Sequence, residues 1–324
     1  MACDFSMVSK YMKIYNDVNR FTIDWTLNTL CTYHCSYCPP TLHRGTNVFK
    51  SKTEDPALIK EFLIKIKNQL QGRSVHIFIN GGEPTISPSL ETIIDFCHES
   101  KWCAYVNTNG SRSLDWWKEY AHKIYKVTIS YHPETVVDEE IFEKVKYIST
   151  QTNVGAFTLM YPPLWDKAVN AYETFKAMDK VTIAPSRVFK RDEGADSQDR
   201  SYEYNEERLQ WLKDNSNVIF KHNVFYPPDG NNYGNTWIDD GATIERLDEV
   251  EFTNNRKNTF LNWKCNMGKD HILITADGRI LQSACKQAKQ IATIFDFTQL
   301  LQESTVCNTN WCMCTADVLI PKRS

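Results

Sequence analysis

Three closely spaced cysteines near the start of this 324-residue sequence are the residues best suited to chemistry. Cys31, Cys35 and Cys38 lie at intervals of four and three residues. Thiolates bind iron–sulfur clusters and zinc, and these intervals let a short loop bring three sulfurs to one side of a metal centre. Three ligands leave a fourth position open, which favours a centre that binds an exogenous molecule. The alternative is a zinc knuckle that takes His34 or His43 as its fourth ligand.

A second group of cysteines lies between residues 265 and 314, close to the end of the sequence. It contains five thiols, more than one tetrahedral centre needs, so we expect a second metal site there. Zinc is the alternative to an iron–sulfur cluster on ligand type alone. Cys97 and Cys103 fall within apolar helix and strand patterns instead, and we expect both to be buried core thiols.

The composition indicates a globular protein. The hydrophobic fraction is 42%, enough for a sizeable core, and the net charge of −3 comes from interspersed acidic and basic residues. This pattern does not predict nucleic-acid binding. No segment approaches the roughly 20 apolar residues that span a membrane, and the amino terminus lacks an apolar leader. Clustered thiols in a chain of this length fit a reducing compartment, so we expect a cytoplasmic protein.

Alternating strands and helices must position these cysteines. Period-two alternation and short apolar runs predict strands at 20–30, 74–80, 102–108, 126–131, 153–160 and 180–186. Helical patterns lie between them at 55–72, 87–96, 113–123, 138–148 and 164–178. Six strand–helix units predict an α/β fold, a partial (β/α)6 TIM-like barrel with a parallel sheet. The expected domains are an N-terminal extension at 1–19, the barrel at 20–190, a bridging segment at 191–260 and a small cysteine-rich module at 261–324.

Polar loops follow the carboxyl ends of the predicted strands, where chemistry collects in such folds. They include the cysteine loop and the segments 81–85, 107–110 and 130–134. His132 precedes Pro133, which biases it to an extended backbone, and it is the candidate catalytic residue as a substrate ligand or proton acceptor. Its alternative is a surface histidine in a turn. Arg187, after the sixth strand, is a weaker candidate for pairing with a carboxylate.

These motifs together resemble the radical S-adenosylmethionine (SAM) superfamily. The resemblance rests on the spacing of Cys31, Cys35 and Cys38 after a first strand, on Tyr37 before the last cysteine, and on "GGEP" at 81–84 after a second strand. It covers about residues 20 to 190. It implies that the three cysteines hold a [4Fe–4S] cluster whose fourth iron chelates SAM. Reductive cleavage of SAM then gives a 5′-deoxyadenosyl radical that abstracts a hydrogen atom from the substrate.

The resemblance also implies contacts with SAM. Gly81 and Gly82 would allow backbone to approach the ligand, and Glu83 would accept hydrogen bonds from its ammonium group. The alternative for "GGEP" is an ordinary strand-to-helix turn. Ribose and carboxylate contacts are expected from side chains that alone would be turn or cap residues. The predicted cofactor-binding residues are thus Tyr37, Gly81, Gly82, Glu83, Pro84, Asn107, Asn109 and Ser130. The segment 153–160 shows no adenine-binding pattern.

The carboxyl-terminal cysteines resemble the twitch module, a shortened form of the SPASM extension of radical SAM enzymes. This implies an auxiliary [4Fe–4S] cluster beside a hairpin that turns at 277–278. The spacing departs from the usual pattern, because Gly278 and Cys285 are far apart and Cys312 and Cys314 are close. The candidate ligands are Cys265, Cys285, Cys307, Cys312 and Cys314, with Cys307 either a ligand or a spare. A cluster closed by four thiolates would accept or relay an electron, which favours net substrate oxidation by an oxidoreductase.

The substrate and partners follow only from the resemblance. About 20 residues precede the first strand, fewer than a peptide-recognition domain needs, so we expect a small-molecule substrate such as a sugar, cyclitol or nucleotide. A flavodoxin or ferredoxin is the expected electron donor. One alternative is a peptide maturase with the same chemistry. The other is a non-catalytic zinc or iron–sulfur protein, which would need neither "GGEP" nor six strand–helix units.

Overall fold

The computed structural model describes residues 12–38, 55–188, 202–215, 235–248, 252–253, 255–312 and 314–324. The chain divides into two compact units. Unit 1 comprises Met1–Asp24, Glu61–His76 and Asn231–Ser324, and unit 2 comprises Trp25–Lys60 and Ile77–Gly230. Helix α1 (Pro56–Gln69) and strands β2 (Arg20–Asn28) and β3 (Ser74–Gly81) each contribute residues to both units. None of the helices in the described ranges is long and apolar enough to cross a membrane.

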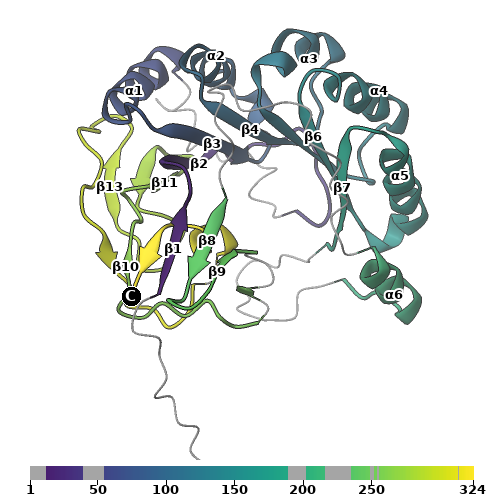
Figure 1. The fold of residues 1–324 in the computed structure, drawn as a ribbon. Helices are drawn as coiled ribbons and strands as arrows, with labels where there is room; N and C mark the ends of the chain where they lie inside the picture. Colours follow the sequence, from purple (N-terminus) through teal and green to yellow (C-terminus); the bar gives the residue numbers. More distant parts are fainter. Residues whose placement is uncertain are drawn as a thin grey trace, which may run out of the picture. The chain divides into compact units, whose positions relative to one another are not determined.

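Unit 2 is built on a parallel sheet (Figure 1). Its strand order is β2-β3-β4-β5-β6-β7, so strands that are consecutive in this part of the sequence are also neighbours in space. The bounds after β3 are β4 Cys103–Thr108, β5 Lys126–Tyr131, β6 Asn153–Leu159 and β7 Val181–Ser186. Parallel register is shown by the partners Val106 and Val127 and by Val127 and Val154. The prediction of an α/β fold with a parallel sheet is confirmed, and this strand order is consistent with a partial barrel.

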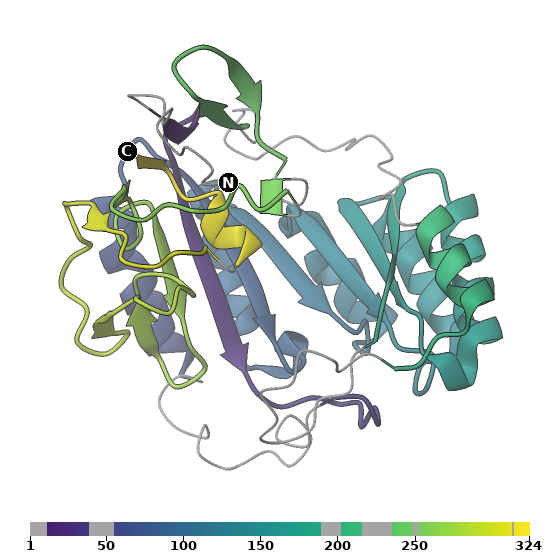
Figure 2. The ribbon, with the colours of Figure 1, turned by 90° about the horizontal axis from the view of Figure 1, so that it is seen from below.

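Helices cover one face of this sheet (Figures 1 and 2). They are α2 Leu90–Ser100, α3 Leu114–Tyr120, α4 Asp138–Ile148 and α5 Trp165–Ala177, with α6 Glu206–Asp214 following, and three short 3-10 turns η4 Pro84–Ile86, η5 Ala121–Lys123 and η6 Pro162–Leu164. Two of these helices, α3 and α6, begin with a side-chain cap. Ser113 accepts a hydrogen bond from Trp116 N at 3.3 Å, and Asn205 accepts one from Arg208 N at 2.9 Å.

Strand β5 shows which side chains face the helices and which face away. Tyr131 packs against Phe142 of α4 and Phe175 of α5, with ring centroids 6.4 and 5.8 Å apart. Because side chains alternate along a strand, Lys126, Thr128 and Ser130 point to the opposite face, which we call the inner face. Asn107 is the register partner of Thr128 on β4 and therefore lies on the inner face as well. The inner face thus carries polar side chains together with Tyr105 and Phe157, the register partners of Lys126 and Ser130.

Unit 1 contains a six-stranded sheet of order β14-β10-β15-β1-β8-β9. Its strands are short and antiparallel: β14 Thr305–Val306, β10 Lys264–Cys265, β15 Lys322–Arg323, β1 Lys13–Asn16, β8 Thr236–Asp239 and β9 Ile244–Arg246. The apolar residues Ile14, Ile238, Phe252 and Phe260 form a core with Cys307, Cys312 and Val318. The residues expected to be an N-terminal extension therefore supply β1, a central strand of this sheet.

The predicted hairpin is also present in unit 1. Strand β11 (His271–Ile274) pairs antiparallel with β12 (Arg279–Leu281), with Leu273 opposite Leu281. Gly278 has a φ of +82°, which favours glycine, and its N–H donates to the carbonyl of Thr275 at 2.8 Å. Strand β13 (Gln290–Thr293) pairs with β12, and the short helix α8 is Thr315–Val318. The hairpin is confirmed, whereas the assignment of 261–324 as an auxiliary-cluster module stays a prediction.

Two other predictions concern segment bounds. The helix expected over 55–72 ends at Gln69, and Gly72 follows with a φ of +75°. Asp55 caps it as expected, accepting a hydrogen bond from Ala57 N at 2.9 Å. Nearly half of the bridging segment 191–260 lies outside the described residues, and its predicted helix at 203–214 is found as α6.

Candidate active site

The cysteine loop follows β2 in unit 2. Its turn is closed by a hydrogen bond from Cys38 N to the carbonyl of Cys35 at 3.0 Å, and Tyr33 N donates to Cys31 Sγ at 3.4 Å. All ten described cysteines of the chain are free, so no disulfide competes for these thiols. Cys35 is buried, whereas Cys31 and Cys38 are half-buried. The loop therefore presents three unmodified sulfurs, two of them open to an incoming group.

Cys35 lies in surroundings that favour a thiolate. A hydrogen bond with Cys38 lowers its pKa to about 3 despite burial, and His132 and Thr135 act in the same direction. Its Sγ lies 3.4 Å from His132 Nδ1 and 3.5 Å from Thr135 Oγ1. Burial instead raises the pKa of Cys31. Because the thiolate is the form that binds metal, Cys35 is ready to act as a ligand at neutral pH.

His132, the candidate catalytic residue, packs on the cysteine loop. Its Nδ1 lies 3.1 Å from Tyr37 OH, and the two rings stack with centroids 5.9 Å apart. Tyr33 meets the imidazole edge-on at 5.8 Å. The carbonyl of His132 accepts hydrogen bonds from Thr135 N and Val136 N, both at 3.1 Å. The imidazole is thus fixed by groups of the loop itself, and its catalytic role stays a prediction.

Gly81 and Gly82 bring two backbone segments together. A Cβ at Gly82 would lie 2.1 Å from the carbonyl oxygen of Leu30, and one at Gly81 would lie 2.6 Å from that of Asn28. Gly82 N donates to the carbonyl of Asn28 at 3.0 Å, and Glu83 N donates to that of Leu30 at 2.6 Å. The close approach that needs glycine is therefore made to the chain just before Cys31. This attachment fixes where the cysteine loop begins.

The carboxylate of Glu83 is fully buried and is used by groups of unit 2. Its Oε1 accepts hydrogen bonds from Thr85 N at 2.9 Å, Thr85 Oγ1 at 2.5 Å and Thr108 Oγ1 at 2.7 Å. Its Oε2 accepts one from Asn109 N at 2.6 Å. The first of these bonds caps η4, where Pro84 is the first residue. Glu83 therefore ties the loop after β3 to the loop after β4, while its predicted contact with SAM stays a prediction.

Asn109 connects the loop after β4 to the cysteine loop. Its Nδ2 lies 3.6 Å from Cys31 Sγ and donates to Thr32 Oγ1 at 3.1 Å. Two further predicted cofactor contacts lie on the inner face. Asn107 donates a hydrogen bond to Asn80 Oδ1, and Ser130 lies at the carboxyl end of β5. The structure thus joins Glu83, Asn109 and the cysteine loop directly, and it gives Asn107 and Ser130 a common face. Arg187 is exposed just after β7.

Three thiols on one short loop are a donor set that fits a [4Fe–4S] cluster. Within the described ranges, no three His, Cys, Asp or Glu side chains are arranged to hold one metal ion. A cluster of four irons is wider than an ion, so its thiolates need only share a rim. Cys35 is hydrogen-bonded to Cys38, and its charge acts on the pKa of Cys31, so the three sulfurs lie near one another. His43, one ligand of the zinc alternative, lies outside the described residues.

The carboxyl-terminal cysteines gather in unit 1. Burial raises the pKa of Cys265, Cys285 and Cys312, and neighbouring cysteines raise it further. Cys265 and Cys285 act on Cys312 in this way, and Cys307 acts on Cys265 and Cys285. Burial raises the pKa of Cys312 to about 12. Cys314 directly precedes α8, and its carbonyl accepts a hydrogen bond from Val318 N at 3.1 Å. Cys307, predicted as ligand or spare, therefore lies near enough to Cys265 and Cys285 for its charge to act on them, and it packs with Cys312 in the core of unit 1.

Buried polar residues beside these cysteines were not predicted from the sequence. Burial raises the pKa of Asp24 and of Asp317 to about 6, and the charge of Asp317 adds to the effect on Asp24. His271 Nε2 lies 3.3 Å from Asp24 Oδ2, but burial lowers the pKa of His271 to about 3, so the imidazole is neutral and the contact is not an ion pair at neutral pH. Asp24 lies in β2, His271 in β11 and Asp317 in α8, so these residues are far apart in the sequence and only the fold could reveal the set.

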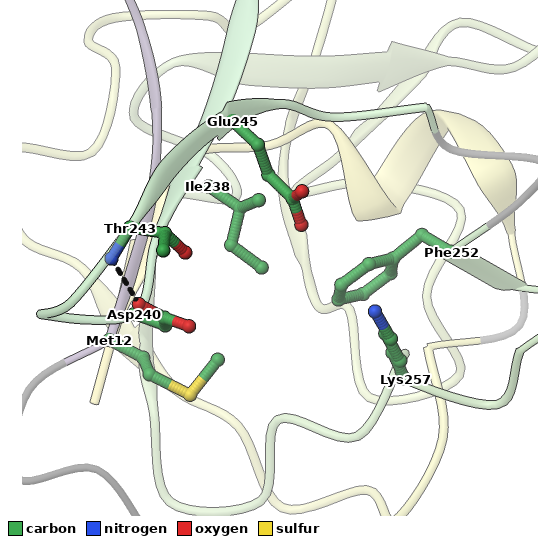
Figure 3. Close-up of a pocket in the computed structure, with 7 residues that line it drawn as sticks. All are labelled: Met12, Ile238, Asp240, Thr243, Glu245, Phe252 and Lys257. Carbon is green, nitrogen blue, oxygen red and sulfur yellow. Dashed lines mark hydrogen bonds between the residues drawn. The ribbon is translucent and has the colours of Figure 1, made fainter.

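A pocket of about 340 Å³ lies elsewhere in unit 1 (Figure 3). Met12, Ile238 and Phe252 supply its apolar lining, and Glu245 and Lys257 bring opposite charges to it. None of the residues predicted to bind a cofactor or a metal lines it. This pocket is therefore separate from the candidate active site.

The family comparison matches the part of the chain that contains the candidate site. Residues 25–156 match the family model of the radical SAM superfamily, a span that holds the three cysteines, "GGEP" and His132. This part of the chain is therefore similar to radical SAM domains. A search of curated proteins found no match.

Solved structures give distant similarities. Streptococcus suis SuiB bound to S-adenosylmethionine is 13% identical with a TM-score of 0.49, over 84% of this chain and 63% of that chain. SuiB bound to its precursor peptide SuiA is 15% identical with a TM-score of 0.47, over 86% and 63% of the two chains. Native anSMEcpe with bound AdoMet is 13% identical with a TM-score of 0.46, over 86% and 79%. This chain thus spans less than two thirds of the length of SuiB.

Proposed function

We propose that this protein is a radical SAM enzyme. Cys31, Cys35 and Cys38 would hold a [4Fe–4S] cluster that, when bound, supplies the electron for reductive cleavage of SAM to a 5′-deoxyadenosyl radical. The observation that carries the proposal is a rim of three free thiols within the span that matches the superfamily. A fourth thiol is not needed there, because the open position is the one that receives SAM.

The residues around the rim hold it in place. Gly82 and Glu83 attach the start of the loop to the end of β3, and Asn109 brings an amide to Cys31 Sγ at 3.6 Å. Hydrogen bonds to ligand sulfurs raise the reduction potential of a cluster, so Asn109 has an electronic role as well as a structural one. Tyr37 and His132 stack beside Cys35 and keep water from it. His132 is also the proposed proton acceptor or substrate ligand.

The inner face of the sheet is the proposed binding surface for SAM and substrate. Asn107 and Ser130 offer an amide and a hydroxyl near the carboxyl ends of β4 and β5, and Thr128 lies between them in register. Gly81 and Pro84 shape the turn that borders this surface. Neutral hydrogen-bonding groups suit ribose hydroxyls and a hydroxyl-rich small-molecule substrate. A sugar, cyclitol or nucleotide is the substrate class that we propose.

The carboxyl-terminal cysteines are proposed to hold an auxiliary [4Fe–4S] cluster. Cys265, Cys285, Cys312 and Cys314 are the proposed ligands, with Cys307 either a ligand or a spare, and the charges that act among Cys265, Cys285 and Cys312 support the nearness of these three thiols. Four thiolates leave no iron open, so this cluster would accept the electron that remains after hydrogen abstraction. The enzyme would then be an oxidoreductase, with a flavodoxin or ferredoxin as the electron donor to the first cluster.

Anaerobic reconstitution tests the first part of the proposal. The protein is loaded with iron and sulfide, reduced with dithionite, and assayed for 5′-deoxyadenosine formed from SAM. Cys35→Ala should abolish cleavage because it removes one of the three thiols proposed to hold the cluster. Cys97→Ala is the matched control, since Cys97 is a fully buried thiol of α2 and should retain cleavage. Failure of the wild-type protein to bind SAM, or full cleavage by Cys35→Ala, would refute the proposal.

Metal analysis tests the second part. Two clusters correspond to about eight irons per chain and one cluster to about four. Cys312→Ala should lower the content to about four irons and spare SAM cleavage, while net oxidation of substrate is lost. Zinc in place of the second set of irons would contradict the auxiliary-cluster proposal and leave the first part intact.

A further inference from the structure

Lys322 lies directly beside one of the carboxyl-terminal cysteines. It is the register partner of Cys265 in the antiparallel pair of β10 and β15. Side chains that are opposite each other in such a pair share a face, with Cβ atoms about 4.5–5.5 Å apart. Both are buried, with 3% of Lys322 and 7% of Cys265 exposed. The lysine side chain therefore runs alongside the thiol in the interior of unit 1.

The ammonium group of Lys322 is held in a fixed position. Its Nζ donates to the carbonyls of Asp317 at 2.7 Å and Val318 at 3.0 Å, at the end of α8. It also lies 4.6 Å from the centre of the Phe260 ring. Two carbonyls and a ring neutralise a buried charge only in part, and burying an uncompensated ion costs several kcal/mol. Within the described part of the chain, no carboxylate is close enough to form an ion pair with Lys322.

The charge of Lys322 affects the pKa of one carboxyl and three thiols of unit 1. The side-chain carboxyl of Asp317 is one of them, but burial has the larger effect and raises its pKa to about 6. The charge of Lys322 also lowers the pKa of Cys265, Cys285 and Cys312, again against a larger effect of burial. One cation thus acts on three of the four thiols proposed as auxiliary ligands. A thiolate-bound cluster would supply negative charge to this buried ammonium.

We propose that Lys322 is a fixed positive charge that raises the reduction potential of the auxiliary cluster and makes it a better electron acceptor. The inference rests on the proposed function, because it needs the auxiliary cluster. Its physical reason is electrostatic. Reduction adds one negative charge to the cluster, and a nearby buried cation stabilises the reduced state more than the oxidised state. Lys322 is not a ligand, so its effect reaches the reaction only through the potential of the cluster.

The test compares three variants of the full-length, reconstituted protein. Lys322→Met removes the charge and keeps the length of the side chain, and Lys322→Arg keeps the charge. Arg323→Gln is the matched control, because it removes one positive charge from the next, exposed residue of the same strand. Iron content is measured first, and the potential of each cluster is then determined by redox titration followed by electron paramagnetic resonance.

Lys322→Met should retain both clusters and shift the auxiliary potential downward. The expected change is at least tenfold in the equilibrium constant for reduction, which is about 59 mV for a one-electron couple. Lys322→Arg and Arg323→Gln should match the wild-type protein. The potential of the first cluster and its cleavage of SAM should not change in any variant.

Three results would overturn the inference. The first is an auxiliary potential in Lys322→Met equal to that of Arg323→Gln. The second is loss of the auxiliary cluster from both Lys322→Met and Lys322→Arg, which would make the lysine a structural residue. The third is a wild-type protein with a single cluster. SAM cleavage is recorded in the same preparations, so failure of this inference is distinguished from failure of the radical SAM proposal.

Discussion

Replacing Glu83 with glutamine tests whether this residue acts by joining loops. The amide oxygen of the new side chain would take the place of Oε1 and keep the bonds from Thr85 and Thr108. The amide nitrogen would then face Asn109 N, which now donates to Oε2 at 2.6 Å. One charge-assisted bond worth about 1.5–3 kcal/mol is lost, and a buried N–H left without an acceptor costs about 1–3 kcal/mol more. We expect Glu83→Gln to lower the free energy of unfolding by about 2.5–6 kcal/mol, a large part of a typical total of about 5–15 kcal/mol.

Urea denaturation of the metal-free protein measures this loss. The matched control is Glu91→Gln, because Glu91 accepts one hydrogen bond, from Trp116 Nε1 at 2.9 Å, on a half-buried side chain. It should cost about 1 kcal/mol or less. Displacement of Asn109 should also reduce iron loading of Glu83→Gln, since Asn109 Nδ2 lies against Cys31 Sγ.

The opposite pattern would refute this reasoning. If Glu83→Gln unfolds within about 1 kcal/mol of the wild-type protein and holds its iron, yet loses SAM binding by calorimetry, then the carboxylate acts on the ligand directly. The contact with the SAM ammonium that the sequence predicts would then be its main role.

Two further changes test the backbone contact and the buried acids. Gly82→Ala should destabilise the metal-free protein in urea by about 1–3 kcal/mol or more and reduce iron loading. The reason is that its Cβ would lie 2.1 Å from the carbonyl oxygen of Leu30. Gly155→Ala is the control and should be close to neutral, because the nearest atom to its Cβ would be 3.9 Å away. Asp24→Asn tests the pKa of Asp24, which burial and then Asp317 raise from 3.8 to about 6. A carboxyl whose pKa is raised in the folded state stabilises the protein below about pH 4, and this stability is lost as the pH rises through 6. The free energy of unfolding of the wild-type protein, relative to that of Asp24→Asn, should therefore fall by up to about 3 kcal/mol between about pH 4 and 7. Exposed Asp115→Asn should show no such trend, and a flat Asp24→Asn difference would contradict the raised pKa.

The fold of residues 74–186 could be predicted closely from the sequence because its signals are local. The strand expected at 126–131 is β5 with the same bounds, and the helix expected at 138–148 is α4. Strands β1, β10 and β15 were not predicted. They have two to four residues, too few for a period, and they exist because distant partners such as Ile14 and Lys322 pair across the sheet.

The sequence predicted the residues of the candidate site but not the hydrogen bonds that join them. Spacing alone identified Cys31, Cys35 and Cys38, and strand ends identified the loops that contain Glu83 and Asn109. Sequence could not indicate that Glu83 is bonded to Thr108, because the partners lie 25 residues apart and meet only through the parallel sheet. The glycines were expected to admit a ligand, whereas the contact found is with the backbone of Asn28 and Leu30. Lys322 gave no signal, since a lysine near the end of a sequence is usually on the surface.

The backbone bonds between residues 28–30 and 82–83 fix the anchor of the cysteine loop without help from iron. In a zinc finger, by contrast, metal and fold arrive together, and removal of the metal unfolds the chain. The backbone bonds that attach the cysteine loop involve no thiol. Loss of the proposed cluster to oxygen should therefore leave the start of the loop attached, and the same chain should be able to take up iron again.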